Sequence, residues 1–128
     1  MPIDENAYQE ELKARDERQK KYDAIVEAAM KRVLDSIRSR TPEISSHMFY
    51  GATGIGPENL VTWYVFKTDA ELAEAKQNGL KKFIEKQTRK ELAAFDYPAE
   101  GVAQMSVSFT TEEDIQNKSP GNPWDYFK

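Results

Sequence analysis

The heptapeptide LVTWYVF, residues 60–66, is rich in β-branched and aromatic side chains and is apolar at six of its seven positions. Such residues favour strands, and a strand that is apolar on both faces is typical of the interior of a sheet. We therefore predict a central strand here and a second strand over Ile44–Tyr50. Because nine residues connect the two runs, an antiparallel pair is the simplest arrangement.

The connection itself, residues 51–59, contains the glycine-rich segment GATGIG. A P-loop needs a lysine directly after its last glycine, and both a P-loop and a dinucleotide-binding loop lead into a helix. Here the first lysine after the glycines is Lys67, the next element is a strand, and no kinase motif follows. We interpret the segment as a flexible hairpin connection, and we retain Thr53, Gly54, Ile55 and Glu58 as a candidate contact loop.

Residues 5–40 are predicted to form one long helix that Thr41-Pro42 ends. Its second half carries an apolar stripe at helical spacing, which indicates one face in the core. The stripe consists of Tyr22, Ile25, Val26, Ala29, Met30, Val33 and Ile37. The first half is densely charged, with Tyr8 and Leu12 as its apolar anchors, so we expect residues 1–20 to form an exposed helical overhang.

The second half of the chain is predicted to begin with a helix capped by Thr68 and Glu71. Asn78-Gly79 ends that helix, and a further helix continues from Leu80 to a stop before Tyr97-Pro98. Alternation in residues 102–109 predicts a half-exposed strand. A short helix follows Thr111 to about residue 117, and the prolines of residues 119–128 predict an irregular tail.

The predicted order is thus α-β-β-α(α)-β-α within a single domain, residues 1–128. The most economical packing of these elements is an α+β fold with a small, mainly antiparallel three-stranded sheet. The long N-terminal helix and the central helices cover one face of that sheet in this prediction.

Composition narrows the function classes. The formal net charge is -4, whereas nucleic-acid binders usually carry a basic excess. The basic cluster within residues 81–90 fits the solvated face of the predicted helix. The N-terminus has no apolar segment typical of a signal peptide, and no membrane span is predicted. With no cysteine in the chain, we expect a cytoplasmic protein without disulfides.

No catalytic, metal or cofactor site is predicted. His47 is the sole histidine, and one histidine without cysteine serves zinc poorly. At the start of a strand it is most simply an ordinary edge residue. A pocket between sheet and helices, with His47, Tyr50 or Trp63 at its mouth, is the competing interpretation, and it would suit a ligand-binding domain or an enzyme.

The C-terminal tail is the most unusual feature of the sequence. Trp124, Tyr126 and Phe127 surround Asp125 in a segment rich in proline and glycine, although chain ends are normally polar. These rings either pack back onto the domain or bind a partner, because exposed aromatic rings are costly. Packing back is the simpler interpretation and the one we favour for the rings themselves. Tryptophan and tyrosine are enriched at interface hot spots, so partner binding by this tail together with Glu112 and Glu113 is our hypothesis for a functional site.

The leading functional hypothesis is a non-enzymatic protein-binding module that occludes or recruits a partner, which charge predicts to be basic. A small, cysteine-free, slightly acidic α+β protein is similar in kind to bacterial immunity proteins, which neutralise toxins by binding them. That likeness implies an inhibitor role and carries over no residues. Two competing hypotheses are a ligand-binding domain or enzyme, and a homo-oligomeric accessory protein.

The long N-terminal helix provides a route to homo-oligomerisation. Its positions 8, 12, 15, 19, 22, 26, 29 and 33 follow a heptad register, which is typical of coiled coils. Arg15 and Gln19 interrupt the register. A homodimer through this helix is therefore a hypothesis beside that of a helix that simply docks on its own domain.

Overall fold

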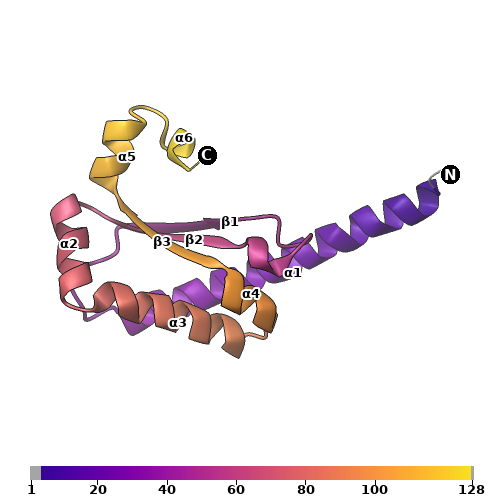
Figure 1. The fold of residues 1–128 in the computed structure, drawn as a ribbon, viewed down its shortest axis with the longest axis horizontal. Coiled ribbons are helices and arrows are strands. Elements are labelled where there is room, and N and C mark those ends of the chain that lie inside the picture. The colour runs from indigo at the N-terminus through magenta and orange to yellow at the C-terminus, as the bar shows by residue number, and fades with distance from the viewer. Residues whose placement is uncertain (1–3, 128) are drawn as a thin grey trace.

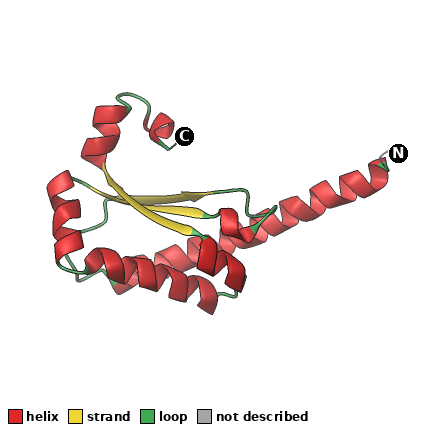
Figure 2. Cartoon of the chain, in the orientation of Figure 1, coloured by secondary structure: helices red, strands yellow, loops and turns green. Residues whose placement is uncertain are grey.

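The computed structural model describes residues 4–127 and confirms the α+β fold (Figures 1 and 2). Its elements are, in chain order, α1 (Glu5–Ser36), β1 (Ser46–Tyr50), the 3-10 turn η1 (Pro57–Asn59), β2 (Val61–Phe66), α2 (Asp69–Gln77), α3 (Leu80–Ala94), α4 (Ala99–Gln104), β3 (Ser106–Thr111), α5 (Glu112–Lys118) and α6 (Pro123–Tyr126). The long helix and both predicted strands around the glycine-rich loop are confirmed.

The three strands form one sheet in the order β1-β2-β3. β1 is antiparallel to β2, as predicted, with His47 opposite Tyr64. β3 is parallel to β2, with Phe109 opposite Tyr64, so the sheet is mixed rather than mainly antiparallel. A parallel pair requires a long crossover that returns the chain to the starting end of the sheet, and α2, α3 and α4 provide it.

One face of the sheet, the inner face, packs on α1 and α3 (Figure 1). On β2 it presents Thr62, Tyr64 and Phe66, all fully buried. The Tyr64 ring stacks on Phe109 with centroids 5.8 Å apart, and its hydroxyl lies 2.8 Å from Thr88 Oγ1 on α3. Burial raises the pKa of Tyr64 to about 12, so this phenol is neutral at physiological pH and acts as a packing group.

α1 ends at Ser36, four residues before the predicted end. The Ser36 hydroxyl donates to the carbonyl of Val33 at 2.6 Å, a local bond of the kind that competes with helical hydrogen bonding. At its other end the helix projects beyond the sheet (Figure 1). Tyr8 is 55% exposed there, which agrees with a solvated overhang.

The capping box that opens α2 is confirmed in part. The Thr68 hydroxyl accepts from the amide of Glu71 at 3.1 Å, while the Glu71 carboxylate accepts from the amide of Lys67, one residue before the cap. Gly79 adopts a φ of +85°, a conformation that favours glycine. α2 and α3 are therefore two helices with a left-handed residue between them.

The predicted strand over residues 102–109 was wrong in its first half, because residues 99–104 form α4 and β3 begins at Ser106. Gly101 lies inside α4 and is buried against Tyr97 and Pro57. The Arg89 guanidinium binds the carbonyls of Val102 and Met105 at the end of α4. These long-range contacts hold a helix where the local alternation favoured a strand.

The prediction of a wholly irregular tail was also wrong, because residues 123–126 form the short helix α6. Pro123 occupies the first turn of that helix. Proline is well tolerated there, since an amide in the first turn has no partner within the helix. Pro123 therefore marks the start of α6 instead of preventing regular structure.

The glycine-rich loop docks on α1. Gln19 bonds it twice: its Oε1 accepts from the Gly54 amide at 2.8 Å, and its Nε2 donates to the Gly51 carbonyl at 3.1 Å. The Arg18 guanidinium donates to the Gly54 carbonyl at 3.0 Å. Gln19, which interrupts the heptad register, thus forms its contacts within the domain. The loop connects two strands and packs against the helix.

Gly54→Ala is expected to destabilise the protein by about 1–3 kcal/mol, because overpacking a close contact has a cost of that order. A Cβ at residue 54 would collide with the backbone carbonyl of Arg15. Urea unfolding measures the change, with Ala52→Ser at an exposed position of the same loop as the control. Equal midpoints for Gly54→Ala and the parent would contradict the docked loop.

Candidate functional site

The outer face of the sheet, opposite α1 and α3, carries the C-terminal tail (Figure 1). Trp63 on β2 forms edge-on contacts with Phe127 and Tyr126, at centroid distances of 5.2 Å and 6.2 Å. Both of these tail rings are half-buried. Two of the three tail aromatics therefore pack back onto the domain.

The Tyr126 hydroxyl ties α6 to the preceding elements. It donates to Asp114 Oδ2 on α5 at 2.5 Å and lies 2.7 Å from Thr110 Oγ1 on β3. This hydrogen bond, together with Lys118 3.3 Å away, lowers the pKa of the Asp114 carboxyl. The tail is thus held by a charge-assisted bond as well as by ring packing.

Trp124 is the tail ring that does not pack back, since it is 67% exposed. It lies at the rim of an open hollow of about 250 Å³ between β1, the end of β2, and the helices α5 and α6. Met48, Val65, Ile115 and Phe127 supply most of the apolar lining. A large exposed ring beside an apolar hollow is the kind of surface that binds partners.

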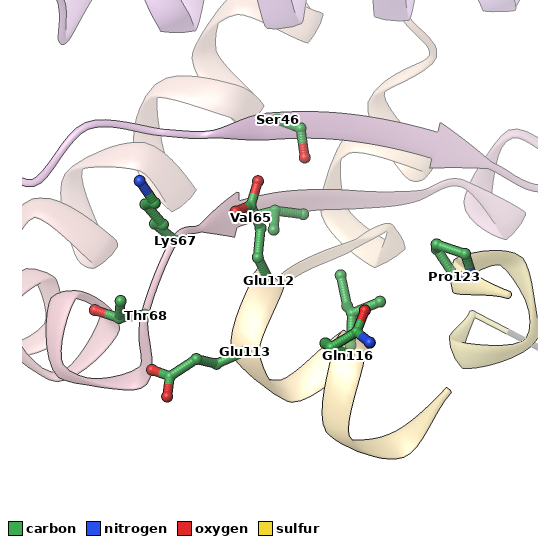
Figure 3. Close-up of a pocket in the computed structure, with 9 residues that line it drawn as sticks. Ser46, Val65, Lys67, Thr68, Glu112, Glu113, Gln116 and Pro123 are labelled. Carbon is green, nitrogen blue, oxygen red and sulfur yellow. The ribbon is translucent and has the colours of Figure 1, made fainter. Parts of the chain in front are cut away.

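A second open hollow, of about 670 Å³, adjoins the first and shares Ser46, Val65, Ile115 and Pro123 with it. Figure 3 shows it between the ends of β1 and β2 on one side and α5 and the start of α6 on the other. Glu112, Glu113, Lys67, Thr68 and Gln116 line its polar part. The two hollows form one continuous surface that is apolar in one part and polar in the other.

Both predicted carboxylates of this surface have partners. Glu112 accepts a hydrogen bond from the Ser45 hydroxyl, and Glu113 accepts from the Asp69 amide at 2.8 Å. The six residues predicted for partner binding, Glu112, Glu113, Trp124, Asp125, Tyr126 and Phe127, therefore come from α5, α6 and the residue after α6. We call the exposed part of this region, namely Trp124, Asp125, Glu112, Glu113 and the two hollows, the tail surface.

The candidate contact loop lies elsewhere. It precedes β2, whereas α5 follows β3 beside the far end of β2, where Thr111 is opposite Phe66. Thr53 and Gly54 are buried against the domain, and Ile55 and Glu58 are exposed. The structure thus does not bring the loop and the tail surface together. Ile55, which is 69% exposed, is the most accessible apolar side chain of the loop.

His47, Tyr50 and Trp63 do not converge on one pocket. His47 lies opposite Tyr64 and so belongs to the inner face, whereas Tyr50 and Trp63 belong to the outer face, where the Trp63 indole donates to the Tyr50 hydroxyl at 3.4 Å. Large side chains such as Met30, Leu80 and Ile84 fill the space between sheet and helices. Within residues 4–127, no cluster of three or more histidine or acidic side chains is arranged to hold a metal ion.

Comparison with known proteins does not place the chain in a family. No family model matches the chain, and no curated protein or solved structure is significantly similar to it. Of the helices in residues 4–127, none is long and apolar enough to cross a membrane.

Tyr126→Phe is expected to raise the pKa of Asp114 towards its ordinary value, because the hydroxyl that stabilises the carboxylate is lost. In the parent protein the folded pKa of Asp114 lies below its unfolded value, so its contribution to stability is present above the unfolded pKa. That contribution is lost as the pH falls through the folded pKa. In Tyr126→Phe, the stability of the fold therefore depends much less on pH in this acidic range.

An NMR titration of the Asp114 carboxyl resonance measures the shift, and the ring signals of Phe127 report whether the tail stays docked. Tyr8→Phe, which removes an exposed hydroxyl on α1, is the control. An unchanged Asp114 titration in Tyr126→Phe would show that the hydroxyl does not hold this carboxylate.

Proposed function

We propose that this protein is a non-enzymatic protein-binding module that uses the tail surface to hold or occlude another protein. The observation that carries the proposal is Trp124, 67% exposed at the rim of an apolar hollow. Its neighbours Tyr126 and Phe127 pack on the sheet, so the exposed ring sits on an ordered support. An anchored tryptophan beside a cavity is a characteristic hot spot of protein interfaces.

The charge of the region supports a basic partner. Glu112, Glu113 and Asp125 are all exposed, and the whole chain carries a net charge of -4. Complementary charge accelerates encounter with a basic protein and suppresses wrong partners. An inhibitor or immunity-type protein that covers a basic site on its target is one concrete form of this proposal.

A small ligand-binding domain or enzyme is the second candidate, and the hollow of about 250 Å³ is the feature that favours it. That hollow is mainly apolar and open, and of its lining residues His47 belongs to the inner face of the sheet. Ligand sites in proteins combine an apolar cavity with converging polar groups. The protein-binding proposal is better supported, because it also accounts for Trp124.

Trp124→Ala is expected to weaken binding of the physiological partner by about 30-fold, the effect of losing a typical hot-spot side chain. The partner is first captured with the parent protein from the source organism, identified by mass spectrometry and purified. Its affinity is then measured by calorimetry. Ile55→Ala, which removes the other prominently exposed apolar side chain near the sheet, serves as the matched control.

Equal binding by Trp124→Ala and the parent would contradict the proposal, provided that both show the same unfolding midpoint. Loss of binding in Ile55→Ala alone would show that the glycine-rich loop, not Trp124, contacts the partner.

The proposed steering by charge predicts that the association rate falls as salt rises, because screening shortens the range of the attraction. Glu112→Gln with Glu113→Gln is expected to reduce both the rate at low salt and its salt dependence. Stopped-flow mixing with the purified partner measures both quantities. An association rate that is independent of salt would rule out a basic partner surface while leaving the role of Trp124 intact.

A further inference from the structure

β1 is an edge strand with one side unpaired. Within residues 4–127, in the order β1-β2-β3, it pairs with β2 alone, and Ser46, His47 and Tyr50 are exposed along it. An unpaired strand edge presents free backbone donors and acceptors and is a template for another strand. Proteins protect such edges with charges, bulges or covering segments, and β1 itself carries no lysine, arginine, aspartate, glutamate or proline.

A distinct stripe of α1 runs beside this edge. Ala24, Glu27, Ala28, Lys31 and Leu34 recur at helical spacing and, together with His47, line an open hollow of about 500 Å³. We call these five residues the flank stripe. It is separate from the core stripe of α1, whose residues Val26, Ala29, Met30 and Val33 are fully buried. The flank stripe thus faces outward at the same side of the domain as the free edge of β1.

The flank stripe and β1 run in opposite directions side by side. Leu34 also lines an adjacent hollow with Ile37 and Ile44, which places the C-terminal end of the stripe near the residues that precede β1. His47 lies among the five residues of the stripe itself. The middle of the stripe, at Ala28, is therefore level with the middle of β1.

We propose that a second copy of this chain occupies this side of the molecule, related to the first by a twofold axis perpendicular to the sheet. Such an axis places β1 antiparallel to β1 of the other copy, with Met48 opposite its own symmetry mate. Pairing of the two edges gives one continuous six-stranded sheet, because each copy contributes three strands. Twofold interfaces are the commonest among homo-oligomers and use the same patch on both subunits.

The same axis also makes the two flank stripes antiparallel, and their charges are complementary in that arrangement. With the axis level with residue 29, and Ala28 the stripe residue nearest to it, Glu27 of each copy lies opposite Lys31 of the other. Both side chains are exposed, and neither forms an ion pair within residues 4–127. The small side chains of Ala24 and Ala28 allow two helices to approach closely, and Leu34 adds apolar contact.

This dimer goes beyond the proposed function and does not depend on it, and the two surfaces meet at Met48, which also lines the apolar hollow of the tail surface. The flank stripe belongs to the inner layer with α1, whereas Trp124 and α5 lie over the outer face (Figure 1). It also differs from a coiled coil formed by the overhang, because Tyr8 and Leu12 do not belong to its interface. A dimer of this kind carries two copies of the tail surface.

The first test is a charge swap on the full chain, measured by sedimentation equilibrium. Lys31→Glu alone and Glu27→Lys alone are each expected to weaken the dimer by about tenfold, since each places like charges opposite each other at both symmetry-related positions. The double swap restores the attraction and is expected to return the dissociation constant to within about twofold of the parent value. Lys20→Glu, an exposed position on α1 outside the stripe, is the control for net charge.

The second test uses the absence of cysteine from the chain. Met48→Cys supplies a single thiol at the proposed axis, where directly opposite residues have Cα atoms about 4.5–5.5 Å apart, within the range that a disulfide bridges. Mild oxidation is expected to convert this variant to covalent dimer at a protein concentration where Ala103→Cys stays monomeric. Ala103 is exposed on α4, away from the edge.

Three outcomes would overturn the proposal. The first is a parent protein that stays monomeric at high micromolar concentration. The second is a dimer that responds equally to Lys31→Glu and Lys20→Glu. The third is a dimer that survives both charge swaps but is lost when residues 1–14 are deleted, which would assign it to the overhang. Rescue by the double swap together with cross-linking at residue 48 supports the dimer, and neither readout involves the partner of the tail surface.

Discussion

The burial of β2 on both of its faces is the constraint on which the other elements depend. Thr62, Tyr64 and Phe66 lie in the core between sheet and helices, while Trp63 and Val65 face the side that α5 and α6 cover. Each face therefore needs its own covering layer, since apolar area exposed to water is costly. α1 and α3 provide one layer, and the C-terminal tail provides part of the other.

This division explains the packing of aromatic residues 126 and 127 on the sheet. Phe127 and Tyr126 cover Trp63 with very few residues, and the bond from Tyr126 to Asp114 orients them. Structural packing accounts for these two rings, so Trp124 is the tail residue whose exposure calls for a function.

The surfaces of the molecule can be distinguished by whether packing within the domain accounts for them. The glycine-rich loop is bound to α1 through Gln19, so its glycines serve a close approach between loop and helix. The tail surface on the outer face and the free edge of β1 beside the flank stripe are two regions that combine open hollows with exposed side chains. We propose another protein as the occupant of the first region and a second copy of this chain as the occupant of the second.

Much of the architecture follows from local sequence, whereas other features depend on contacts between distant parts of the chain. The apolar run at residues 60–66, the stripe that includes Val26 and Val33, and the Thr68 and Thr111 caps each depend on neighbours within a few positions. Residues 102–104 alternate as a strand would, yet Arg89 and the packing of Gly101 hold them in α4. Likewise, the parallel pairing of β3, the docking of two tail rings and the exposure of the third depend on which faces of the elements meet in the folded structure.

The sequence by itself determined what each segment can form, including an aromatic tail beside acidic residues, because hydrogen bonding and capping are local. Only the tertiary structure decided which side chains share a surface, because burial is a property of the whole fold.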